Sequence, residues 1–153
     1  MSDIIAFEAQ TPRMALPLLY PGQAQKEVFV NEALARIDAL LHARVEAVAS
    51  TPPASPVDGQ CWVIGASPTG DWQDKTGQIA CRAAGNWIFV APREGMSVAV
   101  GATGQLLRYH SGNWIFQAAV PAPDGGTTVD AEARTAISAL IARLVGAGII
   151  PAT

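Results

Sequence analysis

The sequence predicts an α+β protein in which a small antiparallel β body, built from repeated Gly-Asn-Trp hairpins, lies between an N-terminal arm and helix and a C-terminal apolar helix. All four tryptophans and most of the 14 glycines lie between Gly59 and Gly126, in short β-prone runs separated by turn residues. On either side of this region, apolar residues recur at the three- and four-residue spacing of helices. With 153 residues, half of them hydrophobic, we expect one core with appendages.

The β body contains an internal repeat. TGQIACRAAGNWIF at 76–89 recurs as TGQLLRYHSGNWIF at 103–116, and eight of the 14 aligned positions are identical. Chance seldom produces such a match within one short chain. Each copy has a strand, a Gly-Asn pair that can supply positive φ, and a second strand whose Trp and Phe share a face because they are two residues apart. Each copy is therefore predicted to be a β-hairpin.

The turn of the second hairpin decides which side chains face the core. A two-residue turn at Gly112–Asn113 would place Ser111 opposite Trp114 and Tyr109 opposite Phe116. The predicted buried face then consists of Leu107, Tyr109, Trp114 and Phe116. A three-residue loop would change this register.

The same register in the first hairpin has one consequence for a charged side chain. Arg82 takes the place of Tyr109, so it is expected opposite Phe89, where it can lie over the ring in a cation–π contact.

The chain before the β body is expected to form an arm and one helix. Residues 1–23 contain three prolines that oppose a helix, so this segment should be an extended arm that packs on something. Asn31 could cap a helix that runs to about Ala47, and the β-branched and aromatic run Val28–Val30 also admits a short strand before it. The apolar face of this helix would carry Val30, Leu34, Ile37, Leu41, Val45 and Val48.

Two stretches rich in Pro and Gly predict the domain organisation. The arm and helix are expected to cover 1–48, and a linker should follow at 49–59. The hairpin body should span 60–120, a second linker 121–128, and an oligomerisation helix 129–153.

The C-terminal helix is predicted from Val129 to Val145, ending at Gly146. The helix start is predicted from Thr127 or Thr128 and from the acidic residues that follow them. Its middle, 135–142, has no charged residue, so it must pack on its own body or on copies of itself. We expect a homotrimer whose interface carries Ile137, Leu140, Ile141 and Leu144.

Composition and charge exclude several function classes. The net charge is −3 and the pI is near 5.2, which argues against binding to nucleic acid. No window is long and apolar enough for membrane insertion, and no signal peptide is recognised, so synthesis in a cytoplasm is expected. Only 15% of residues are charged, which suggests that part of the surface is buried against other chains.

No catalytic constellation stands out, so no enzymatic activity is predicted. Asp71 and Asp74 are better explained as a solvated turn than as the carboxylate pair of a glycosidase. Ser111, His110 and Asp124 lack a nucleophile elbow, and neighbouring residues of a strand point to opposite faces.

No metal or other cofactor is predicted either. Cys61 and Cys81 do not form a CxxC pair or another metal-ligand spacing, and we expect them to be small buried side chains. A zinc site could be drawn from them with His42 and His110, but their spacing does not support it.

A ligand site, if present, is expected where an aromatic ring is exposed. Trp72 lies between Asp71 and Gln73 in a glycine-bounded loop, so its ring could stack on a sugar while the neighbouring side chains bond the hydroxyls. The alternative is that Trp72 folds down as a lid over the hairpins.

Four stretches of the sequence resemble a family found in tailed phages, prophages and gene transfer agents of alphaproteobacteria. They are TPRMALPLLYPGQAQKEVFVNEALARIDAL at 11–40, PPASPVDGQCWVIGASPTGDW at 52–72, NWIFVAPREGM at 86–96 and TTVDAEAR at 127–134. PGQAQKEV with NEAL is the most specific of these strings.

The resemblance implies a virion location and a role as a tail, fibre or spike component linked to host recognition, with other tail proteins as partners. Such proteins are commonly trimers, and the family brings no established catalytic residues. The alternative function is a carbohydrate-binding module that recognises a host surface polysaccharide. A glycan hydrolase would need an acid and a nucleophile that the sequence does not offer.

Overall fold

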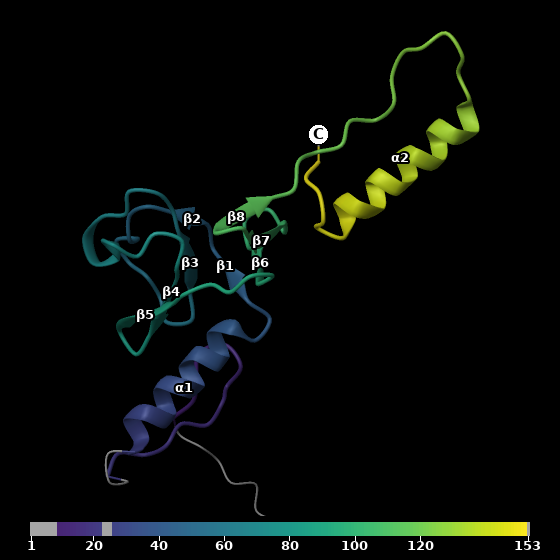
Figure 1. Cartoon of the computed structure of the whole chain (residues 1–153). Coiled ribbons are helices and arrows are strands. Elements are labelled where there is room, and N and C mark those ends of the chain that lie inside the picture. The colour runs from purple at the N-terminus through teal and green to yellow at the C-terminus, as the bar shows by residue number, and fades with distance from the viewer. Residues whose placement is uncertain (1–8, 23–25, 153) are drawn as a thin grey trace, which may run out of the picture. The chain divides into compact units, whose positions relative to one another are not determined.

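The α+β class is confirmed by the structure, a computed structural model that describes residues 9–22 and 26–152 (Figure 1). Within these residues the chain forms two α-helices, one short 3₁₀ helix and eight strands. None of the described helices is both long and apolar enough to cross a membrane.

The chain divides into two compact units, one up to Pro92 and the other from Arg93 onward. This boundary lies between the two repeated hairpins, so the region 60–120, predicted as one body, contributes a hairpin to each unit. The first unit contains α1 (Lys26–Leu40), β1 (Arg44–Val45), β2 (Val48–Ala49), β3 (Cys61–Ile64), the 3₁₀ helix η1 (Gly70–Trp72), β4 (Ile79–Ala83) and β5 (Asn86–Val90). The second contains β6 (Ser97–Val100), β7 (Leu106–His110), β8 (Asn113–Phe116) and α2 (Ala131–Gly146).

The first unit is built on a sheet with the strand order β2-β3-β4-β5. β2 runs parallel to β3, and the remaining neighbours are antiparallel. Every residue of β3 is buried, as expected for a central strand that is covered on both faces. Strand β5 forms one edge of the sheet.

Both repeats are hairpins, as predicted, but each turn lies one residue earlier than expected. In the first hairpin Ala83 pairs with Asn86, so the turn residues are Ala84 and Gly85, with φ of 49° and 72°. Positive φ at both central residues defines the type I′ turn, which fits the twist of a hairpin. The Asn86 side chain donates to Ala84 O at 2.9 Å, which explains why asparagine follows the turn instead of lying in it.

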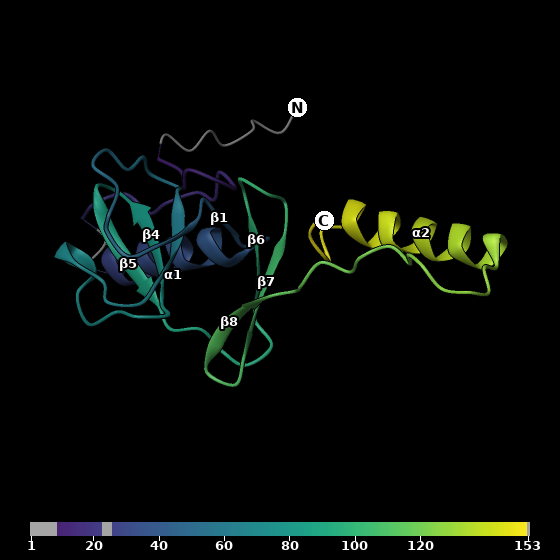
Figure 2. The same cartoon turned by 90° about the horizontal axis from the view of Figure 1, so that it is seen from above.

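The second hairpin repeats this turn at Ser111 and Gly112, and Asn113 donates to Ser111 O at 3.1 Å. Tyr109 therefore pairs with Trp114, and the predicted pairing of Tyr109 with Phe116 is wrong. The turn shift moves the pairing by two residues, so the same side chains share a face. Of that face, Leu107 is buried, Tyr109 and Trp114 are half-buried and Phe116 is exposed. Figure 2 shows β6, β7 and β8 in succession.

Helix α1 occupies a different range from the prediction. It begins at Lys26, so the alternative strand at 28–30 is wrong, and it ends at Leu40 rather than near Ala47. Asn31 is not a cap: its side chain accepts from Leu19 N at 2.8 Å and donates to Leu19 O at 3.0 Å. Inside the helix, Asn31 therefore pairs with the backbone of the arm.

The expected core face of α1 is also wrong. The buried residues of the helix are Asp38 and Ala39, whereas Val30, Ile37 and the following Leu41 are exposed. The described part of the arm, 9–22, is irregular as predicted.

A buried carboxylate explains which face of α1 turns inward. Asp38 accepts from Thr11 Oγ1 at 2.7 Å, from Arg13 N at 3.1 Å and from Met14 N at 2.6 Å. The Arg13 guanidinium returns to α1 and donates to Asp38 O and to Ala39 O, at 3.1 and 2.6 Å. A buried carboxylate is stable only when such donors replace water. The arm and helix are therefore held together by polar contacts.

Helix α2 begins close to the predicted position. Asp130 is its N-cap, and the side chain accepts from Ala133 N at 2.8 Å. After the helix, Gly148 O accepts from Leu106 N at 3.1 Å, and Ile150 is buried. The segment that follows α2 is thereby joined to the start of β7.

Candidate functional site

Three tryptophans form an aromatic cluster in the first unit. The ring centroids of Trp72 lie 6.1 Å from Trp62 and 5.2 Å from Trp87, and those of Trp62 and Trp87 are 5.7 Å apart. The tilted and edge-to-face angles between the rings are those that aromatic pairs prefer. Trp62 and Ala80 pair across β3 and β4, and η1 brings Trp72 onto this face of the sheet.

Of the two arrangements expected for Trp72, the exposed ligand platform is wrong. Trp72 is 0% exposed, so its ring has no free face for a sugar, whereas Asp71 and Gln73 on either side are exposed. The structure thus has the alternative arrangement, in which Trp72 closes over the hairpin. Trp62 is also buried, and Trp87 and Trp114 are half-buried.

The predicted cation–π contact exists with a different ring. Because of the turn shift, Arg82 pairs with Trp87, and its guanidinium carbon lies 5.2 Å from the Trp87 ring centroid. Phe89 has Lys75 over its ring instead, at 5.5 Å. Both contacts place a charge at the border of the aromatic cluster.

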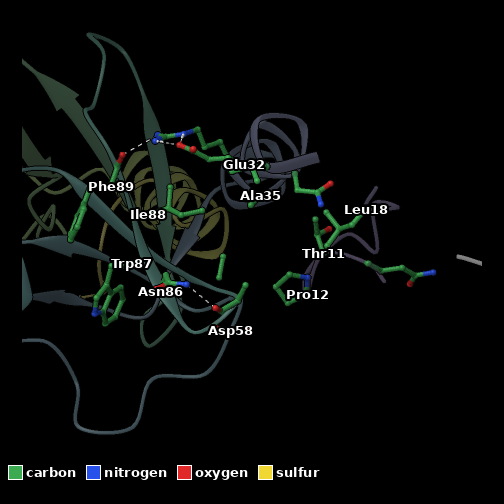
Figure 3. A pocket seen from close by; sticks show the side chains of 16 residues that line it. Thr11, Pro12, Leu18, Glu32, Ala35, Asp58, Asn86, Trp87, Ile88 and Phe89 are labelled. Atoms are coloured by element: carbon green, nitrogen blue, oxygen red, sulfur yellow. Dashed lines mark hydrogen bonds and ion pairs between the residues drawn. The ribbon is translucent and has the colours of Figure 1, made fainter. Parts of the chain in front are cut away.

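A groove of about 760 Å³ lies between the arm, α1 and β5 of the first unit (Figure 3). Ile88 points from β5 toward Ala35 of α1, while Trp87 and Phe89 point to the other side of the strand. The aromatic rings of β5 are therefore directed toward the aromatic cluster. The groove is lined by Leu18, Val28, Asn31, Glu32, Arg36, Asp58, Asn86 and Ile88, among others.

The open edge of β5 forms one wall of this groove. Residues that flank a two-residue turn are hydrogen-bonded to each other, so Trp87 and Phe89 direct their backbone groups away from β4. Arg36 Nη1 donates to Phe89 O at 3.0 Å, and Arg36 Nη2 pairs with Glu32 Oε1 at 2.7 Å. Chemically, such an edge can accept an extended backbone.

The charged groups of the groove are engaged in structural contacts. Glu32 is paired with Arg36, and Asp58 accepts from Gly85 N at 3.1 Å in the first hairpin turn. These contacts orient the groove walls. They do not form the nucleophile and base pair that covalent catalysis requires.

The residues that the sequence analysis considered and rejected as catalytic groups have other contacts or are exposed. Asp71 and Asp74 are both exposed. The His110 ring contacts Glu94 through Nδ1, and Glu94 Oε2 accepts from Ser111 N at 3.0 Å. The Asp124 carboxylate accepts from Gly125 N at 2.8 Å. His110 is therefore oriented by Glu94, a residue that the sequence patterns did not indicate.

The contact with His110 also affects the acidity of Glu94. The hydrogen bond from the His110 ring lowers the pKa of the Glu94 carboxyl below its ordinary value of 4.5, and the backbone N–H of Ser111 contributes in the same direction. Both groups are exposed, which is typical of a surface contact that fixes a hairpin turn.

Cys61 and Cys81 are buried free thiols, as predicted. Among the residues that the structure describes, no three or more His, Cys, Asp or Glu side chains are grouped so that they could hold a metal ion.

The predicted oligomer residues lie on a fully capped helix without a buried side chain. In the single chain, none of the residues of α2 is buried. Leu140 is 64% exposed, Ile137 43% and Leu144 39%, and Ile141 is half-buried. These four side chains share one side of the helix because they lie three, four and seven residues apart.

Comparison with known proteins assigns the chain to a family. The model of the family described as "Protein of unknown function (DUF2793)" matches residues 30–115, and the chain belongs to this family. The matched segment contains most of α1, the whole first hairpin and the second hairpin up to Ile115. No curated protein matches the sequence.

Proposed function

We propose that this protein is a non-catalytic virion component of a tailed phage or gene transfer agent, a fibre, spike or host-attachment subunit that assembles through α2. The observation that carries the proposal is the apolar side of α2. Leucine and isoleucine side chains on a helix with no buried residue are unfavourable in water, and each contributes about 1.5–3 kcal/mol when it is fully buried.

Permanent assemblies cover such surfaces. Interfaces between chains that do not dissociate are more hydrophobic than those of transient complexes. The stretch 135–142 has no charged residue, so several copies of α2 can approach each other without burying an unpaired charge. A trimer with the helices near the threefold axis fits this pattern and the resemblance to phage tail proteins.

The carbohydrate-binding alternative loses its named site, because Trp72 is buried. Host attachment through a glycan would have to use other residues.

The experiment is to purify particles from a strain that carries the gene and to quantify the protein in them. We expect a fixed ratio of this chain to the main tail protein, and particles that lack it should adsorb less to host cells. A Leu140→Asp chain should be missing from particles. Ala139→Asp, on the opposite side of the same helix, is the matched control and should be incorporated. Particles that contain no copy of the wild-type chain would refute the proposal.

A further inference from the structure

Cys61 and Cys81 lie directly opposite each other on the antiparallel strands β3 and β4. One position earlier on β3, Arg82 N donates to Gln60 O at 2.9 Å, and Cys61 O accepts from Glu46 N at 2.7 Å, away from β4. Hydrogen-bonded and non-hydrogen-bonded pairs alternate along an antiparallel ladder. The two cysteines therefore form a non-hydrogen-bonded pair, whose Cα atoms approach to about 4.5 Å and whose side chains are closest.

This separation is within the range that a disulfide requires, which is about 4.4–6.8 Å between Cα atoms. Both side chains are on the same face of the sheet, and each is 2% exposed. We propose that Cys61 and Cys81 are a redox pair that closes to an intramolecular disulfide in an oxidising environment. The inference rests on strand register and is independent of the proposed virion role.

The contacts around the pair decide which sulfur reacts first. The neighbouring Cys81 thiol, as a hydrogen-bond donor to the Cys61 thiolate, lowers the pKa of Cys61, and the positive charge of Arg13 acts in the same direction. The same bond and burial raise the pKa of Cys81. Cys61 is therefore the attacking thiolate, since the thiolate is the nucleophile of the exchange reaction.

The oxidant is a low-molecular-weight disulfide. The Cys61 thiolate attacks one of its sulfurs, a mixed disulfide forms, and the first small thiolate leaves. Cys81 then loses its proton to solvent and attacks Cys61 Sγ, which releases the second small thiolate. The two cysteines are oxidised by two electrons, and the small disulfide is reduced to two thiols.

The arm covers the pair. Pro12 and Arg13 line a small cavity beside both cysteines, and a Cβ added at Gly59 would lie 3.2 Å from each of these two arm residues. Oxidation therefore requires the arm to open, and we expect it to be slow in the folded protein. Closure would join two core strands once the protein has left a reducing cytoplasm.

The test uses the full chain, purified reduced and incubated with oxidised glutathione until the number of free thiols is constant. The protein is then unfolded, alkylated and weighed. We expect no alkylated cysteine, a mass about 2 Da below that of the reduced chain, and a disulfide-linked pair of tryptic peptides, 45–75 with 76–82. Dithiothreitol should restore both thiols.

The matched controls are Cys61→Ser and Cys81→Ser, each of which keeps one thiol. Each should carry one alkyl group or one glutathione, and the linked peptides should be absent. Two alkylated cysteines in the wild type at the end point would overturn the proposal. So would stable glutathione adducts, or links between chains instead of within one.

Discussion

At the scale of single residues, burial decides the roles of the most conspicuous side chains. Trp72 looks like an exposed ligand platform in the sequence because polar residues flank it on both sides. Its indole is buried instead and packs against Trp62 and Trp87. The position of the ring depends on how the loop between β3 and β4 folds back, a long-range property that local polarity does not encode.

Trp72→Ala should therefore lower the stability of the fold, and its main effect should not be on ligand affinity. We expect a loss of about 3–5 kcal/mol in the free energy of unfolding, because the substitution leaves a large cavity in the aromatic cluster. Trp72→Phe should cost less, since the indole Nε1 has no acceptor among the described residues. Urea unfolding measures both. Asp71→Ala, at an exposed neighbouring position, should change stability by at most about 0.5 kcal/mol; an equal loss there would contradict this role of Trp72.

The Asp38 carboxylate should be the main link between the arm and α1. Asp38→Ala removes the acceptor of two backbone N–H groups, those of Arg13 and Met14. An unsatisfied buried donor costs about 1–3 kcal/mol, so we expect a loss of about 2–4 kcal/mol. Hydrogen exchange at these two amides should also become faster. Unchanged protection of both amides would show that the arm is held by other contacts.

The contact of Glu94 with His110 should make stability depend on acid pH. The pKa of Glu94 is lowered in the folded protein, so its contribution is present above the ordinary value of 4.5 and is lost as the pH falls through the lowered pKa. Melting temperatures of the wild type and Glu94→Gln should differ at about pH 6, and the difference should shrink as the pH falls below 4.5. A difference that persists undiminished until the protein unfolds in acid would exclude this cause.

At the scale of elements, the sequence predicts the type of each structure better than its limits. Both hairpins were predicted from the repeat. The side chains predicted to share a face still do so, because moving the turn by one residue shifts the strand pairing by two residues. The predicted turn position is wrong because Ala84 and Ser111 adopt positive φ, a conformation that the prediction assigned to Gly and Asn. The buried side of α1 was wrong because a carboxylate, Asp38, and not the apolar stripe, turns toward the arm.

Helix α2 should tolerate a charge on one side and not on the other. Leu140→Asp places a carboxylate among the apolar residues proposed to meet in the oligomer, and we expect the dissociation constant to rise at least about tenfold. Ala139→Asp lies on the opposite side and should leave assembly unchanged. The folded monomer should survive both substitutions, since no residue of α2 is buried. Analytical ultracentrifugation of the variants checks this, and an intact Leu140→Asp oligomer would place the interface elsewhere.

At the scale of the whole molecule, composition and sequence motifs predicted the fold class and the family more accurately than local periodicity predicted the packing. The α+β class and the buried cysteines are confirmed, and the chain belongs to the family whose model matches 30–115. The division at Pro92 was not predicted because the repeat itself suggested a continuous body. Contacts of the arm with α1 and the groove beside β5 join residues far apart in sequence, so periodicity alone could not reveal them.

Native mass spectrometry of the full chain tests the proposed assembly most directly. If α2 joins the copies, the dominant species should have three times the chain mass of 15.9 kDa, and it should persist on dilution to low micromolar concentration, as expected of a permanent apolar interface. A single species of 15.9 kDa at all concentrations would contradict the structural role proposed for this protein.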